Sequence, residues 1–168
     1  VLATLYAHPY RVLAIAAHGL FEASGPDGRR YSGVVLSDGL LLTAVEIEQM
    51  EVVPELVFIN CCHLGGLNAP AGGSGGAAYA PEQLAYSVAR ALVEMGVRAV
   101  VAAAWAVDDN AASTFAATFF DRLGAGETFG DAVFAARRAT FEQHPASNTW
   151  GAYQAWGDPG YRLHPGAA

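Results

Sequence analysis

Short apolar runs alternate with amphipathic stretches along this chain. Four runs are rich in aliphatic and aromatic residues and have the length of buried strands, at positions 11–17, 55–61, 98–105 and 152–156. Three stretches have apolar residues at helical spacing and end at or near a helix-breaking residue, at positions 81–95, 111–123 and 129–143. This alternation predicts an α/β fold in which helices cover both faces of a mainly parallel sheet.

A β-hairpin and a short helix are predicted between the first two buried runs. Asp38-Gly39 lies between two short apolar stretches and is the dipeptide most typical of a tight hairpin turn. Thr43 can cap a helix over residues 44–50. Glu46 follows three residues later, which completes the sequence pattern of a capping box.

A glycine-rich segment without charged residues follows the second buried run. Positions 64–80 are dominated by small residues and proline, which predicts a flexible loop. The segment lacks the Gly-Lys-Ser/Thr ending of a phosphate-binding loop and the glycine spacing of a dinucleotide-binding turn. We therefore expect no nucleotide or other organic cofactor. We also expect no metal centre, because the adjacent Cys61, Cys62 and His63 lack the ordinary spacing of zinc ligands.

The length and composition predict one folded domain over residues 1–168. Hydrophobic residues make up 53% of the chain and charged residues 15%, which argues against a disordered tail. The longest uninterrupted apolar stretch, at positions 99–107, is far shorter than the roughly 20 residues that cross a bilayer. The two cysteines are adjacent and no secretory leader opens the sequence, so we expect a reducing, cytoplasmic location.

The charge balance argues against polyanionic partners. The chain has nine basic residues, all arginine, against sixteen acidic ones, and its net charge is −7. A protein that follows a phosphate backbone needs clustered cations, and only Arg29-Arg30 and Arg137-Arg138 are adjacent here. We therefore expect neither a nucleic acid nor a membrane surface as partner.

Reactive or charged residues follow three of the predicted strands. They are His18-Gly19, Asn60 to His63, and Asp108-Asp109. The carboxyl ends of parallel strands meet at one edge of a sheet, where ligands bind in open α/β folds. A thiol and an imidazole at this edge can carry out acyl transfer, because the thiolate attacks a carbonyl and the imidazole protonates the leaving amine.

Backbone amides near these residues can complete such a site. Gly19 has no side chain, so its N–H can approach the substrate and, with the N–H of the cysteine, donate to the developing oxyanion. The alternative is that both cysteines are small buried hydrophobes and His18 is a hydrogen-bonded residue at a strand end. The residues alone leave both interpretations open.

Five blocks of the sequence together resemble a CHAT domain. They occur in the family order and read AAHGLF, GVVLSDGLLLTAVEIEQM, PELVFINCCHLGG, SVARALVEMGVRAVVAAAWAVDDNAA and WGAYQAWGDP. The CHAT family belongs to the caspase-like cysteine peptidases, which are related to separase and the metacaspases. The resemblance implies a caspase-like three-layer sandwich with a mainly parallel central sheet.

The resemblance also implies which residues react. The histidine of the family's His-Gly block corresponds to His18, with Gly19 as an oxyanion donor. The CHAT pattern Ser-Ala-Cys-Glu-Thr-Gly aligns with positions 60–65, so Cys62 matches the nucleophile and Cys61 matches the alanine. The metacaspase pattern Asp-x-Cys-His-Ser-Gly gives the same register. His63 is then a neighbour of the nucleophile, with a structural role expected ahead of a catalytic one.

Substrate preference is where the sequence departs from the metacaspases. Those enzymes have Asp two residues before the nucleophile, where it helps to bind a basic side chain, and this chain has the neutral Asn60. The block from Trp105 to Asp109 resembles the one that supplies pocket-lining acids in separase-like and CHAT peptidases. This resemblance implies that Asp108 or Asp109 can still bind an Arg or Lys before the scissile bond, and that Trp105 can form a wall of that pocket. The structural alternatives are a helix cap for the acids and a core position for the tryptophan.

The resemblance further implies a larger parent protein. Caspase-like sheets have a strand–helix unit before the histidine strand, and this chain reaches that strand by position 11, so we expect that unit to be missing here. CHAT domains typically follow sensor or repeat domains, which would be partners alongside a protein or peptide substrate. Two other functions remain: a catalytically inactive signalling or scaffold module, and a hydrolase or acyltransferase with a non-protein substrate.

Overall fold

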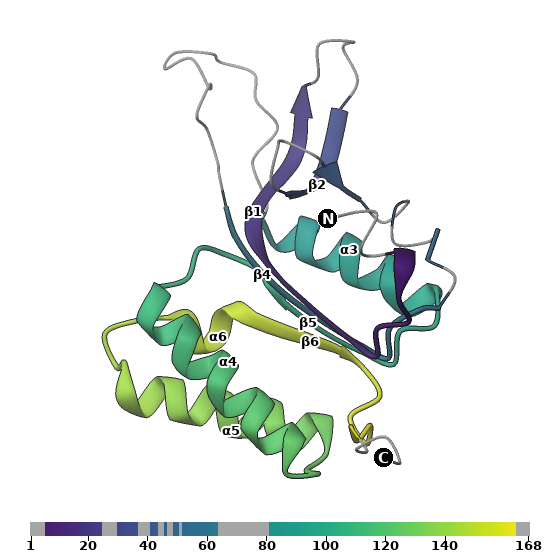
Figure 1. Ribbon diagram of the computed structural model, residues 1–168. Coiled ribbons are helices and arrows are strands. Elements are labelled where there is room, and N and C mark those ends of the chain that lie inside the picture. The colour runs from purple at the N-terminus through teal and green to yellow at the C-terminus, as the bar shows by residue number, and fades with distance from the viewer. Residues whose placement is uncertain are drawn as a thin grey trace, which may run out of the picture.

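A mixed sheet of six strands lies at the centre of the described chain, in the order β3-β2-β1-β4-β5-β6. The computed structural model describes residues 6–24, 30–36, 41–43, 46, 49–50, 52–63 and 81–163. The strands are β1 (Val12–Ser24), β2 (Arg30–Val35), β3 (Leu41–Leu42), β4 (Leu56–His63), β5 (Ala99–Ala103) and β6 (Tyr153–Gly157). The helices are α3 (Pro81–Glu94), α4 (Asp109–Gly124), α5 (Phe129–Gln143) and α6 (Thr149–Ala152). Figure 1 shows α3 on one face of the sheet and α4 with α5 on the other.

The three central strands run parallel, as the alternation of elements predicts. β1 pairs with β4 and β4 with β5 in parallel, whereas β2, β3 and β6 join the sheet in antiparallel orientation. The antiparallel β6 has a simple cause. Two helices follow β5, so the chain returns to the carboxyl end of β5 before β6 begins, and Ala104 N–H donates to Ala152 O there at 2.9 Å. The α/β sandwich with a parallel core is confirmed.

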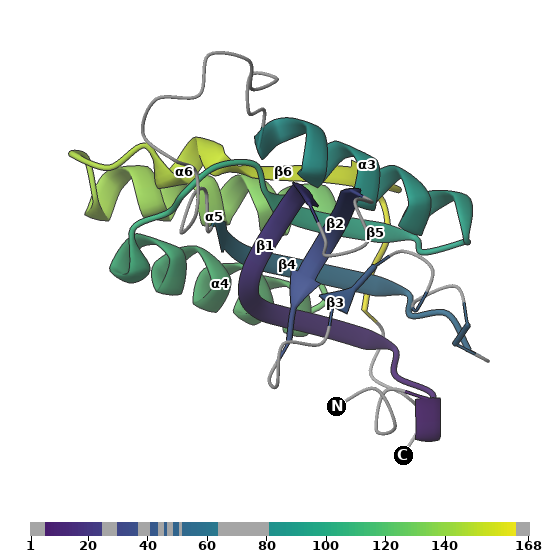
Figure 2. The ribbon, with the colours of Figure 1, turned by 90° about the horizontal axis from the view of Figure 1, so that it is seen from above.

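β1 is longer than its apolar run and changes partner along its length. It pairs with β4 from Val12 to Gly19 and with β2 from His18 to Ser24, with a shift of register between Leu20 and Ala23. Figure 2 shows the bend that separates these two halves. His18 and Gly19 are therefore residues of the strand, at the point where it leaves the parallel sheet, and the expected strand end at position 17 is wrong.

Both faces of β4 and β5 are buried, which explains their continuous apolar sequences. In β1, Ile15 is buried whereas Ala14 and Ala16 are exposed. On one face, Val57 and Ile59 of β4 pack in a cluster with Ala89 and Leu92 of α3. On the other face, β4 and β5 pack against the aromatic side of α4 and the small residues of α5. The residues of this second cluster include Leu56, Phe58, Val101, Phe115, Phe119, Ala132 and Ala136. The alternation of the strands thus divides the core into two layers.

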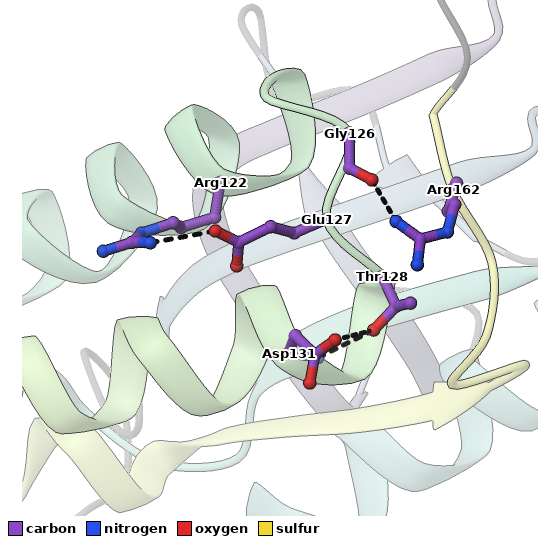
Figure 3. A network of polar contacts seen from close by, with 6 residues as sticks. All are labelled: Arg122, Gly126, Glu127, Thr128, Asp131 and Arg162. Atoms are coloured by element: carbon purple, nitrogen blue, oxygen red, sulfur yellow. Dashed lines mark hydrogen bonds and ion pairs between the residues drawn. The ribbon is translucent and has the colours of Figure 1, made fainter.

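Side-chain caps and ion pairs hold α4 and α5 together at their connection (Figure 3). Thr128 caps α5, since its Oγ1 accepts from the N–H of Asp131 at 3.2 Å. Arg122 Nη1 lies 2.8 Å from Glu127 Oε1 across the turn, and Arg162 donates to the carbonyl oxygen of Gly126. These contacts involve exposed groups, so they fix the geometry of the turn more than they add stability.

Polar residues also join the amino ends of the strands. Arg11, before β1, forms an ion pair with Glu55, before β4, and the bond to Arg11 lowers the pKa of the Glu55 carboxyl below its ordinary value of 4.5. Arg98, before β5, pairs with Asp158 at 3.2 Å and lies over the ring of Tyr161. Burial, followed by the neighbouring Glu55, raises the pKa of Tyr161.

Several local predictions fall wholly or partly outside the described residues. These are the glycine-rich loop at 64–80, the Asp38-Gly39 turn and most of the helix at 44–50. One of the two bonds of the predicted capping box is present, because Thr43 N–H donates to Glu46 Oε2 at 2.7 Å. Thr43 Oγ1 donates to the same carboxylate oxygen. No helix within the described ranges combines the length and the apolar character that a membrane span needs.

Candidate active site

The parallel pairing of β1 and β4 brings His18 and Cys62 opposite each other. The two residues are Cα partners, and the pairs on either side are Ala17 with Cys61 and Gly19 with His63. They lie at the carboxyl end of β4 and midway along β1, where the parallel pairing of the two strands ends. Open parallel sheets bind ligands at this edge. The structure describes the backbone of positions 18, 19 and 61–63 but not their side chains.

The alternation of β4 gives its two cysteine positions different neighbours along the strand. Phe58 packs among the aromatic residues of α4 and Asn60 bonds Tyr153, so these two residues belong to the face covered by α4 and α5. Val57 and Ile59 belong to the face covered by α3. Residues two apart on a regular strand share a face. Position 62 therefore continues the row of Phe58 and Asn60, and position 61 continues the other row.

Tyr153 holds the side chain of Asn60, although the sequence pattern indicates only a core position for this tyrosine. Asn60 is half-buried, and its Oδ1 accepts a hydrogen bond of 3.0 Å from the hydroxyl of Tyr153. Tyr153 begins β6 and is 0% exposed. A tyrosine at the start of an apolar strand carries little sequence signal beyond packing. The clue is that a buried phenol needs a hydrogen-bond partner.

Asp108 and Asp109 stand at the start of α4 and differ in their contacts. Asp108 is the N-cap, and its Oδ1 accepts from the N–H of Ala111 at 3.0 Å while its own N–H donates to Thr149 Oγ1 at 2.9 Å. Asp109 lies in the first turn and is exposed, and its carboxylate has no hydrogen-bond partner within the described residues. The capping interpretation of Asp108 is confirmed, and a ligand-binding role for Asp109 stays a prediction.

Trp105 follows β5 and is half-buried against the α3 side of the core. A methyl group on Gly151 would lie 3.6 Å from its ring, so α6 passes close to the indole. Its Nε1 is buried and has no hydrogen-bond partner among the residues that the structure describes. The packing agrees with the core interpretation, and the prediction that Trp105 also forms a pocket wall stays a prediction.

The described side chains contain no group of three or more His, Cys, Asp or Glu residues that could hold a metal ion. The charge near the described part of this edge is negative, because Asp108 and Asp109 lie at the start of α4. The arrangement therefore offers anionic groups near the strand ends, with the His18 and Cys62 positions in register.

Comparison with curated proteins finds no relative that matches this sequence. Comparison with protein families gives a different result, since the family model described as the CHAT domain matches residues 1–158. That range covers every described strand and helix, including both positions of the register pair. The chain therefore belongs to the CHAT domain family, a module related to the caspase-like peptidases.

Proposed function

We propose that this domain is a cysteine endopeptidase with Cys62 as nucleophile and His18 as general acid and base. The observation that carries the proposal is the Cα pairing of these two residues across β1 and β4. Neighbouring parallel strands lie about 4.8 Å apart, so register partners are close enough for side chains to interact. The match to the CHAT family supports the same reaction class.

The reaction follows from these groups. The Cys62 thiolate attacks the carbonyl carbon of the scissile peptide bond, and the backbone N–H groups of Gly19 and Cys62 donate to the resulting oxyanion. The His18 imidazolium then gives its proton to the leaving amine as the C–N bond breaks. Water, activated by the neutral imidazole, hydrolyses the thioester and restores the thiol. The imidazole also favours the thiolate at neutral pH.

The choice of Cys62 over Cys61 has two supports. Cys62 is the register partner of His18, whereas Cys61 pairs with Ala17. The CHAT pattern gives the same choice, because Cys62 aligns with the family's nucleophile and Cys61 with its alanine. The assignment therefore makes Cys61 a packing residue.

We propose a preference for a basic residue before the scissile bond. Asp109 is exposed at the amino end of α4, and the net charge of the chain is −7. A carboxylate binds a guanidinium through charge-assisted hydrogen bonds, which are stronger than neutral ones. Asp108 is occupied as the cap of α4, so this role falls to Asp109.

The test uses a peptidyl acyloxymethyl ketone with arginine next to the warhead, applied to the full-length protein at neutral pH. Cys62→Ala should abolish covalent labelling and peptide cleavage, while the matched Cys61→Ala should retain most of both. Equal losses in the two variants would reject the assignment of the nucleophile. A wild-type protein that neither labels nor cleaves would instead support the inactive scaffold module.

A further inference from the structure

We propose that Tyr153 is a positioning residue that fixes the Asn60 carboxamide, so that Asn60 meets the substrate as a hydrogen-bond donor. The amide then recognises an acceptor group of the substrate, and binding of a cationic side chain depends on Asp109. This inference rests on the peptidase function proposed above. It adds a substrate-selecting role for Asn60 and names Tyr153 as the residue that sets the orientation of the Asn60 carboxamide.

The Tyr153 hydroxyl has a fixed position because its ring and backbone are both held. The ring stacks on Phe115 with centroids 4.0 Å apart and on Phe58 at 5.6 Å. The backbone carbonyl of Tyr153 accepts from Arg137 Nη2 at 2.7 Å. The side chain is fully buried. A rotation that removed the hydroxyl from Asn60 would have to disrupt this aromatic packing.

The sheet register explains how a residue of β6 reaches one on β4. Tyr153 is the Cα partner of Ala103 on β5, and the residue before Asn60, Ile59, is the partner of Ala102. One step further in this register places Asn60 beside Ala103. The three residues therefore form one row across the sheet. The small Ala103 side chain lets the tyrosine extend across β5, and its hydroxyl lies 3.0 Å from Asn60 Oδ1. Asn60 is two residues before Cys62 on the same strand.

The direction of this hydrogen bond determines what Asn60 offers to a ligand. The hydroxyl proton of Tyr153 goes to the carbonyl oxygen, so the two Nδ2 hydrogens remain as donors. A guanidinium has donors only and gains nothing from an amide N–H, whereas a carbonyl or carboxamide accepts from it. An aspartate at this position would have acceptors only, so the Asn60–Tyr153 pair reverses the polarity of this contact.

The experiment compares two peptides that differ only in arginine or citrulline before the scissile bond. Citrulline has the shape of arginine but is neutral and carries a carbonyl acceptor. The readout is the ratio of kcat/KM for arginine to kcat/KM for citrulline, measured on the full-length protein. A purely structural role for Tyr153 would lower both values together and leave this ratio unchanged.

Tyr153→Phe should raise the arginine-to-citrulline ratio at least about threefold, because the freed amide can turn its oxygen toward the substrate. Asn60→Asp should raise the ratio about tenfold or more. In the Asn60→Asp background, Tyr153→Phe should add no further change, because both carboxylate oxygens are acceptors. Tyr161→Phe is the matched control, since it removes another buried hydroxyl at the opposite end of the sheet and should leave the ratio at the wild-type value.

Asn60→Ala keeps the test decisive if Tyr153→Phe fails to fold. It should lower citrulline cleavage at least about threefold more than it lowers arginine cleavage. Two outcomes would overturn the inference and leave the peptidase function intact. One is a Tyr153→Phe protein that still cleaves through Cys62 with an unchanged arginine-to-citrulline ratio. The other is an equal loss of cleavage for both peptides in Asn60→Ala. Absence of any Cys62-dependent cleavage by the wild-type protein would overturn both.

Discussion

Arg11 Nε lies 2.7 Å from Glu55 Oε1 at the amino ends of β1 and β4, the two strands that pair His18 with Cys62 at the far end of their shared register. The ion pair and the backbone bonds from Glu55 and Leu56 to the carbonyl oxygen of Arg11 set the register at one end. Because paired strands keep that register along their length, the same contacts determine which residues meet at the other end. A structural ion pair thus supports the candidate site from a distance.

The first prediction concerns the pH dependence of stability. The hydrogen bond to Arg11 lowers the pKa of Glu55 in the folded state below 4.5. Its contribution is therefore fully present above the unfolded-state pKa and is lost as the pH falls through the lower folded-state pKa. The side chains are 43% and 33% exposed, so the contribution should be at most about 1 kcal/mol.

Urea denaturation at pH 7 and at pH 3 measures this contribution. Glu55→Gln should reduce the difference in unfolding free energy between the two pH values. Glu94→Gln serves as the control, because its pair with Arg90 lies on the exposed surface of α3 and is 62% exposed. If Glu55→Gln and the control gave the same pH dependence, the ion pair would have no role in stability.

The second prediction separates the two acids at the start of α4. Asp108→Ala should lower the unfolding free energy by about 1 kcal/mol, because the N–H of Ala111 loses its cap. Asp109→Ala should change stability by less than about 0.5 kcal/mol, since its carboxylate is exposed. The same Asp109 variant should reduce kcat/KM for a peptide with arginine before the scissile bond about tenfold or more.

Asparagine variants provide the matched controls for these two acids. Asp108→Asn keeps a capping oxygen and should retain most of the stability that Asp108→Ala loses. Asp109→Asn removes the charge at nearly constant size and should reduce arginine cleavage as Asp109→Ala does. Selectivity that depends on Asp108 alone would show that the two roles are assigned to the wrong residues.

The elements that sequence patterns predicted well are those with local determinants. The helix over 129–143 begins and ends as expected, because Thr128 supplies a cap within one turn of the start. The hydrogen bond from Thr43 N–H to Glu46 is local in the same sense. The CHAT resemblance, which depended on blocks in order, indicated the family correctly.

The features that were missed depend on contacts between distant parts of the chain. The extension of β1 to Ser24 needs β2 as a partner, and its apolar sequence ends before that pairing begins. The antiparallel direction of β6 depends on how α4 and α5 return the chain. The bond from Tyr153 to Asn60 crosses two strand pairs, so no spacing along the sequence signals it.

A third prediction concerns the turn that ends β6. Gly157 has φ +107°, and a Cβ there would lie 2.2 Å from the carbonyl oxygen of Arg98. Gly157→Ala therefore adds a clash with β5 to the strain of a left-handed backbone, and should lower the unfolding free energy by about 3 kcal/mol or more. Gly96→Ala is the control, because Gly96 has φ +103° but a methyl group there would meet no atom within 4 Å, and this variant should cost about 1 kcal/mol. Equal losses would mean that the backbone moves to relieve the clash.

A fourth prediction tests whether the aromatic layer under α4 stabilises the site as well as the fold. Phe115 is fully buried and stacks on Tyr153, so Phe115→Ala should lower the unfolding free energy by about 3–5 kcal/mol. Phe134→Ala on α5 is the control, since that ring is 67% exposed and its loss should cost less than about 0.5 kcal/mol. The milder Phe115→Leu keeps most of the core volume but removes the stack, so it should shift the arginine-to-citrulline ratio in the same direction as Tyr153→Phe. A destabilised but folded Phe115→Leu protein with wild-type selectivity would show that Tyr153 keeps its position without this contact.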